Sequence, residues 1–106
     1  MSSFSISYLI ASHNPSELVK FYASINHENS LSSLGVNHYL LKYKDGHKIQ
    51  FFKPSDRRPF LKKGERVSIC FQKAASENPM LELRGCIDLL VDLGSTIKAE
   101  PRLEEF

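Results

Sequence analysis

The stretch that decides the fold is Asn37-His38-Tyr39-Leu40-Leu41-Lys42-Tyr43-Lys44-Asp45-Gly46-His47-Lys48-Ile49-Gln50-Phe51-Phe52. Two runs rich in aromatic and aliphatic residues flank the dipeptide Asp45-Gly46, which accepts the positive φ angles of a two-residue turn. The pattern therefore predicts an antiparallel β-hairpin. With a two-residue turn, Tyr43 would lie opposite Lys48, and Leu41 would lie opposite Gln50.

This register predicts which side chains share a face of the hairpin. One face would carry Tyr39, Leu41, Tyr43, Lys48, Gln50 and Phe52. The other face would carry His38, Leu40, Lys42, His47, Ile49 and Phe51. Both faces are largely apolar, and such a strand pair is usually covered by helices on one side and by another sheet or an enclosed cavity on the other.

A strand and a helix are predicted before the hairpin. Residues 4–11 alternate as a strand does. Asn14-Pro15-Ser16-Glu17 then supplies a capping side chain, a proline at the first helical position and an acidic residue at the third, so a helix begins there. Residues 27–35 are polar and predict either a loop or a short edge strand. The apolar stripe of the helix consists of Leu18, Phe21, Tyr22 and Ile25.

The same order of strand and helix returns after the hairpin. Residues 55–64 form a connector, and residues 66–72 alternate as a second strand in which Ser68 matches Ser7 of the first. A second helix is predicted from Pro79 to Leu93-Gly94, where the glycine suits the end of a helix. The chain therefore contains an internal repeat of strand and helix.

Composition limits the class of protein. The chain has 106 residues and 42% hydrophobic residues, which predicts one globular domain. A net charge of +2 gives no sign of a nucleic-acid partner. We expect a cytoplasmic protein without a membrane segment, because no long apolar run or signal peptide is present. Cys70 and Cys86 are expected to be reduced thiols.

The chain resembles the vicinal oxygen chelate superfamily, which contains glyoxalases, bleomycin-resistance proteins and extradiol dioxygenases. The resemblance rests on the order and spacing of residues 6–10, 14–22, 45–54 and 89–101. The resemblance implies an α+β fold in which paired βαβββ modules form a curled mixed sheet around a cavity. Residues 4–54 would form the first module, and residues 65–106 would form a second module that lacks its last strands.

Metal-dependent members of this superfamily take a His or Gln from the first strand of a module and a Glu from the fourth. The matching positions in this chain are Ser7, Gln50 and, in the second module, Ser68. Hydroxyl and carboxamide groups bind divalent transition metals poorly. We therefore expect no metal, no other cofactor and no catalytic residues.

The resemblance then implies a pocket that sequesters a small molecule, as in the bleomycin-resistance proteins. Aromatic rings would stack on a planar or aromatic ligand, and glutamine side chains would orient it by hydrogen bonds. The candidate ligand-binding residues are Tyr39, Leu41, Tyr43, Gln50, Phe52, Ser7, Leu9, Ser68, Cys70 and Gln72.

Three alternatives stay open. In the first, the aromatic side chains of the hairpin fill a hydrophobic core instead of lining a ligand pocket; these are Tyr39, Tyr43 and Phe52. The protein would be a metal-dependent lyase, isomerase or dioxygenase if a partner chain completed the ligand set, which metal analysis would reveal. It would serve only as an assembly module if the cavity were closed.

Charged and edge-forming segments complete the expectations. The connector region holds six basic residues between positions 53 and 66, but Asp56 and Glu65 in the same window favour a solvated loop over a phosphate or nucleic-acid site. Residues 98–106 are expected to cover the open sheet edge or lie along a partner subunit in a homodimer. The histidines lack metal-binding spacing and are expected to be solvated: His13, His27, His38 and His47.

Overall fold

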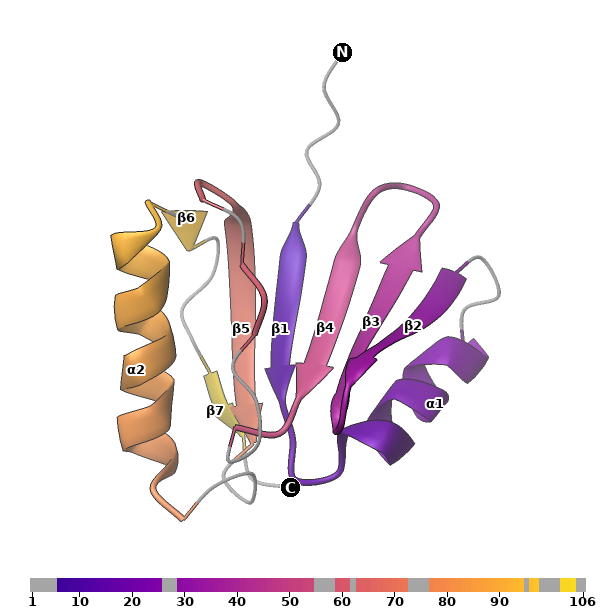
Figure 1. The fold of residues 1–106 in the computed structure, drawn as a ribbon, viewed down its shortest axis with the longest axis horizontal. Coiled ribbons are helices and arrows are strands. Elements are labelled where there is room, and N and C mark those ends of the chain that lie inside the picture. Colours follow the sequence, from indigo (N-terminus) through magenta and orange to yellow (C-terminus); the bar gives the residue numbers. More distant parts are fainter. Residues whose placement is uncertain are drawn as a thin grey trace.

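The computed structural model describes residues 6–25, 29–54, 59–61, 63–72, 77–94, 96–97 and 102–104 (Figure 1). The elements are β1 Ser7–Ala11, α1 Pro15–Ile25, β2 Asn29–Gly35, β3 His38–Tyr43, β4 Lys48–Phe52, β5 Arg66–Gln72, α2 Pro79–Asp92, β6 Thr96–Ile97 and β7 Arg102–Glu104. The predicted strand at residues 66–72 and both predicted helix starts are confirmed. Residues 4 and 5 of the predicted first strand lie outside the described residues.

The strands form one open mixed sheet in the order β2-β3-β4-β1-β5-β6, and β7 also pairs with β5. The central strand β1 runs parallel to both β4 and β5. On one side of it, β2, β3 and β4 form an antiparallel meander. On the other side, β6 and β7 both run parallel to β5. The predicted α+β class is therefore confirmed.

The hairpin of β3 and β4 is present, but its predicted two-residue turn is wrong. The amide of Tyr43 donates to the carbonyl of His47 (2.9 Å), and the amide of Gly46 donates to the carbonyl of Tyr43 (3.0 Å). The loop therefore contains residues 44–46. Gly46 has a φ of 95°, as in the three-residue hairpin loops that end on a left-handed glycine.

One extra loop residue moves the side chains of β4 to the other face relative to β3. Leu40, rather than Leu41, lies opposite Gln50, and His38 lies opposite Phe52. The prediction that Gln50 and Phe52 share a face with the tyrosines of β3 is therefore wrong.

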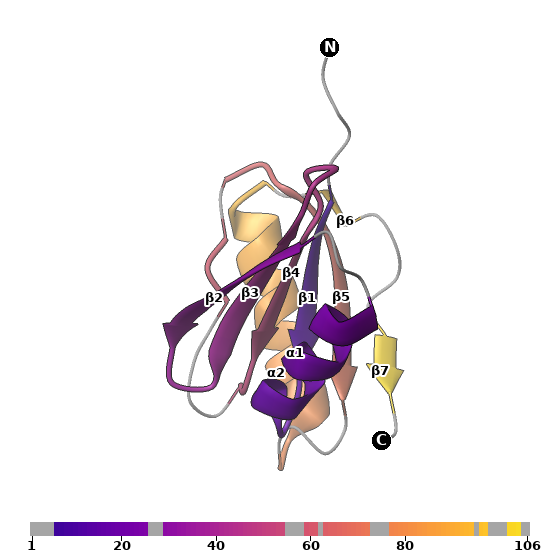
Figure 2. The same ribbon diagram turned by 90° about the vertical axis from the view of Figure 1, so that its right-hand side faces the viewer.

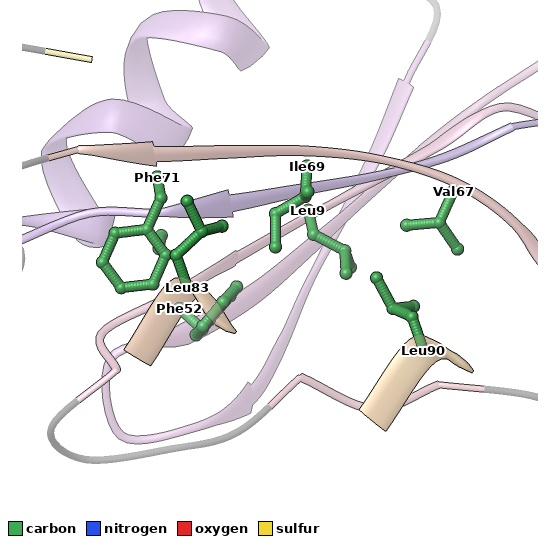
Figure 3. Packing of buried hydrophobic residues seen from close by; sticks show 8 residues of the cluster. Leu9, Phe52, Val67, Ile69, Phe71, Leu83 and Leu90 are labelled. Carbon is green, nitrogen blue, oxygen red and sulfur yellow. The ribbon is translucent and has the colours of Figure 1, made fainter. Parts of the chain in front are cut away.

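Each face of the sheet carries one helix, and Figure 2 shows α1 in front of the sheet and α2 behind it. Alternate residues of β1 divide the core in two: Leu9 and Ala11 pack with α2, whereas Ile10 packs with α1. We call the two sides of the sheet the α2 face and the α1 face. Figure 3 shows how Leu83 and Leu90 of α2 lie against the strands.

The internal repeat does not place its serines as predicted. Ser7 pairs with Val67, whereas Ser68 pairs with Tyr8. Paired residues of neighbouring parallel strands point to the same face, so Ser7 lies on the α2 face and Ser68 on the α1 face. The two helices that follow β1 and β5 likewise lie on opposite faces.

Both ends of the sheet are formed by short or polar strands. Residues 29–35 form the edge strand β2, one of the two alternatives for that segment. Arg102–Glu104 pairs with β5 at the opposite edge, as expected for part of residues 98–106; residues 98–101, 105 and 106 lie outside the described residues. No helix in the described part of the chain combines the length and apolar character needed to cross a membrane.

Candidate functional site

A pocket of about 270 Å³ lies on the α1 face, and we call it the α1-side pocket. α1 packs mainly on β3 and β4, so space remains between this helix and the strands β1 and β5. Four predicted ligand-binding residues border the pocket: Ser68, Cys70 and Gln72, which belong to the α1 face, and Leu9, whose side chain packs in the core on the α2 face.

Five other lining residues were not predicted as site residues: Tyr8, Ile10, Leu18, Tyr22 and Ile49. Leu18 and Tyr22 belong to the apolar stripe predicted for the first helix. Alternation along the first strand likewise places Tyr8 and Ile10 on one face. The signal for these residues was therefore present, but the sequence does not say where on the sheet α1 lies.

Gln72 contributes a buried acceptor without a donor. Its side chain is only 3% exposed, and its Oε1 has no hydrogen-bond partner in the described structure. Leaving such a group unpaired costs about 1–3 kcal/mol, and buried polar groups are therefore nearly always bonded. Because Gln72 lines the pocket, an N–H or O–H group of a bound molecule would supply the missing bond.

Two tyrosines give the pocket an aromatic character. The ring of Tyr22 packs edge-to-face on Phe51, with 5.3 Å between ring centroids. The ring of Tyr8 lies at 6.2 Å from that of His47. Aromatic side chains in such contacts present large apolar walls that suit a flat ligand.

Cys70 and Cys86 are both half-buried, and neither forms a disulfide bond in the described part of the chain. The two cysteines lie on opposite sides of the sheet, since Cys70 lines the α1-side pocket and Cys86 packs against the α2 core. The expectation that both cysteines are reduced thiols stays a prediction.

The six remaining candidate residues do not line this pocket. Tyr39, Leu41 and Tyr43 pack in the α1 core, and Leu41 is fully buried there. Phe52 is buried in the α2 core. Ser7 and Gln50 lie on the α2 face, where both take part in hydrogen bonds. The ten predicted residues therefore do not form one site, because the hairpin register and the match between the two serines were each wrong by one residue.

Burial raises the pKa of the Tyr43 phenol above its ordinary value of 10.0, with smaller contributions from Tyr22 and Asp45. The phenolate is disfavoured because it would lose solvation and face other negative charge. Tyr43 therefore keeps its proton at neutral pH.

Gln50 holds the connector on the α2 face. Its Nε2 donates to the carbonyl of Phe60 (2.9 Å), and its Oε1 accepts from the amide of Phe60 (2.6 Å). His38 Nε2 lies 2.5 Å from the same Oε1 and must be the donor, because that oxygen has no proton to give. The His38 and Phe60 rings also pack at 4.7 Å.

The prediction that His38 is solvated is wrong, since the residue is fully buried. His47 is also held in place, because its Nδ1 accepts from the amide of Ile6 (3.0 Å). His13 is exposed as predicted, and His27 lies outside the described residues.

Two of the residues that the resemblance matches to metal ligands, Ser7 and Gln50, make other contacts in this structure. The Ser7 hydroxyl donates to Glu65 Oε1 (2.7 Å), and Gln50 is engaged with the connector. Among the described residues, no three His, Cys, Asp or Glu side chains lie close enough together to hold a metal ion.

Comparisons with protein-family models, with curated proteins and with solved structures found no match to this chain.

Proposed function

We propose that the protein binds a small, flat, largely apolar molecule in the α1-side pocket and holds it without transforming it. The observation that carries this proposal is the buried Oε1 of Gln72 in the pocket wall, which has no hydrogen-bond partner among the described residues. An acceptor in that position selects a ligand with a hydrogen-bond donor, and its burial strengthens the selection.

The pocket walls define the rest of the ligand. Tyr8 and Tyr22 contribute aromatic rings, and the aliphatic residues from β1, β4 and α1 contribute apolar surface. A volume of about 270 Å³ is at the small end for ligand pockets, so the ligand is a single or fused ring system rather than a long chain.

We further propose that the chain is one domain of the vicinal oxygen chelate type, without a metal. The order β1-α1-β2-β3-β4, with β1 parallel to β4, supports a complete βαβββ module over residues 4–54. After the connector, β5 and α2 repeat the strand and helix, and the short strands β6 and β7 take the place of a longer meander in a second module over residues 65–106.

Indole is a suitable probe because it is flat, apolar and has one N–H donor, and 1-methylindole is its counterpart without the donor. We expect indole to shift the backbone amide NMR signals of Ser68, Cys70 and Gln72 in a saturable way. Gln72→Leu should lower the affinity for indole about three- to tenfold, the value of one hydrogen bond. The same substitution should leave binding of 1-methylindole nearly unchanged.

Two variants on α1 provide a matched pair. Tyr22→Leu removes an aromatic wall of the pocket, whereas Phe21→Leu changes a neighbouring residue that is 59% exposed and does not line it. Only Tyr22→Leu should weaken indole binding. No saturable shift with indole, or equal effects of the two variants, would refute the pocket as a ligand site.

The enzymatic alternative predicts a different result. Mass spectrometry measures the metal content of the purified protein. Stoichiometric zinc, nickel, manganese or iron that is lost when individual side chains are substituted would favour a metal-dependent lyase, isomerase or dioxygenase over a binding protein.

A further inference from the structure

The α2 face carries a second pocket of about 240 Å³, between the sheet and the connector. We call it the connector pocket. Its floor contains Lys42 and Lys48 from the hairpin, and its cover contains Phe60, Leu61 and Glu65. It lies on the opposite face of the sheet from the α1-side pocket.

Lys42 and Lys48 lie directly opposite each other on the paired strands β3 and β4. They therefore point to the same face, and like charges in this arrangement destabilise a sheet. A negatively charged group beside the two lysines would offset the repulsion between their ammonium groups.

Glu65 offsets only part of this charge. Its Oε1 accepts from Lys48 Nζ (3.0 Å) and from the Ser7 hydroxyl (2.7 Å), which fixes the position of the Lys48 side chain. Lys42 is exposed and has no ion-pair partner in the described residues. Two lysines and one carboxylate leave the pocket wall with an excess of positive charge.

The rest of the wall is apolar. Leu34 and Leu40 come from the sheet, and Phe60 and Leu61 come from the connector. Phe60, in the described part of the connector, is held over the sheet by two hydrogen bonds between its backbone and Gln50. The pocket therefore has a cover that includes Phe60, an apolar interior, and positive charge at Lys42 and Lys48.

We propose that the connector pocket binds a small organic acid, with its carboxylate between Lys42 and Lys48 and its apolar body under the connector. The carboxylate relieves the repulsion between the two ammonium groups, and the apolar body is removed from water. This site and the α1-side pocket lie on opposite faces of the sheet and share Tyr8 among their lining residues, but the lysines are absent from the α1-side pocket and Gln72 is absent from the connector pocket.

Benzoate tests the proposal, because it combines a carboxylate with a flat apolar body, and benzamide has the same shape without the charge. Benzoate should shift the amide NMR signals of Leu40, Lys42 and Leu61 in a saturable way, and added salt should weaken its binding. Benzamide should bind markedly more weakly.

Lys42→Gln should lower the affinity for benzoate about fivefold, the upper value for an exposed ion pair. Lys20→Gln removes an exposed lysine from α1, away from the pocket, and should have no effect. The stability of the free Lys42→Gln variant should not fall, since the change removes a repulsion.

Three results would overturn the proposal. These are the absence of a saturable shift, equal affinities for benzoate and benzamide, and shifts confined to the amides of Ser68, Cys70 and Gln72. The last result would assign benzoate to the α1-side pocket and leave the connector pocket without a ligand.

Discussion

Gln72 and His38 each bury a polar atom that has no partner in the described structure, but their surroundings differ. Gln72 Oε1 belongs to a residue of a pocket wall, where a ligand can reach it. His38 Nδ1 belongs to a fully buried ring that packs on Phe60 and donates through its other nitrogen to Gln50. The first arrangement favours binding, whereas the second holds the connector in place.

A substitution of His38 tests this structural role. His38→Ala removes a donor to Gln50 and leaves a cavity under Phe60, so it should lower the free energy of unfolding by about 2–4 kcal/mol. Urea denaturation measures this change. His13→Ala is the control, because His13 is exposed and its loss should change stability by no more than about 0.5 kcal/mol. Equal effects of the two substitutions would contradict the role of His38.

The raised pKa of Tyr43 predicts how the stability of the protein depends on pH in the alkaline range. Because burial raises its pKa in the folded protein, the folded state holds this proton more strongly than the unfolded chain does. The stabilisation is complete below the ordinary pKa of 10.0 and is lost as the pH rises through the higher folded value. In urea titrations, the wild-type protein should therefore lose more stability above about pH 10 than Tyr43→Phe does. Parallel curves for the two proteins would contradict this prediction.

At the scale of elements, replacing two glycines by alanine should change the free energy of unfolding in opposite directions. Gly46 closes the hairpin loop with a φ of 95°, so Gly46→Ala should destabilise the protein by about 1–2 kcal/mol. Gly85 lies inside α2, and a Cβ added there meets no atom within 4 Å apart from its chain neighbours and the backbone of its own helix. Gly85→Ala should therefore stabilise the protein by about 0.5–1 kcal/mol. The free energies of unfolding in urea measure both changes. A Gly46→Ala variant of unchanged stability would contradict the left-handed conformation of Gly46.

Local signals predicted most of the elements. Proline and capping residues marked the start of α1, alternation marked β5, and a glycine with a φ of 70° follows α2 at Gly94 as expected. The hairpin was also found, but Asp45-Gly46 fits both a two-residue and a three-residue loop. The hydrogen bond from the Tyr43 amide to His47 and the pairing of Lys42 with Lys48 decide between them, and no sequence pattern reports either one.

The candidate site was predicted in part for a similar reason. Alternation along β5 placed Ser68, Cys70 and Gln72 on one face, and all three line the α1-side pocket. Tyr22 was identified as apolar helix surface rather than pocket wall, because the position of α1 on the sheet depends on tertiary packing. The pairing of Ser7 with Val67 likewise depends on how β1 and β5 meet, which similar local patterns do not determine.

At the scale of the whole molecule, the two edges of the sheet differ. β6 and β7 pair with β5 at one edge, whereas β2 ends the sheet at the other. Residues 29–35 contain no proline and no charged residue, which are two of the features that prevent edge strands from pairing, and the strand is regular from Asn29 to Ser33 before its register shifts at Gly35. The homodimer therefore stays a prediction, and we expect it to form through antiparallel pairing of two β2 strands.

Light scattering at high protein concentration should give twice the chain mass of 12.1 kDa. Leu31→Lys places a charge on β2 at a side chain that is 49% exposed, and it should shift the equilibrium toward the monomer. Val36→Lys is the control, because Val36 is 68% exposed in the turn after β2. A wild-type protein that is monomeric at every concentration would show this prediction to be wrong.

The central place of β1 also has a consequence for synthesis on the ribosome. This strand leaves the exit tunnel before both of its neighbours in the sheet, which are residues 48–52 and 66–72. Such pairings between distant parts of a chain form slowly, and a strand that waits for its partners is open to association with other chains. A nascent chain that ends before residue 66 lacks β5 and leaves Leu9 and Ala11 without most of their core. The sheet is therefore completed only after β5 has emerged, and until then the apolar side chains of β1 are open to association with other chains.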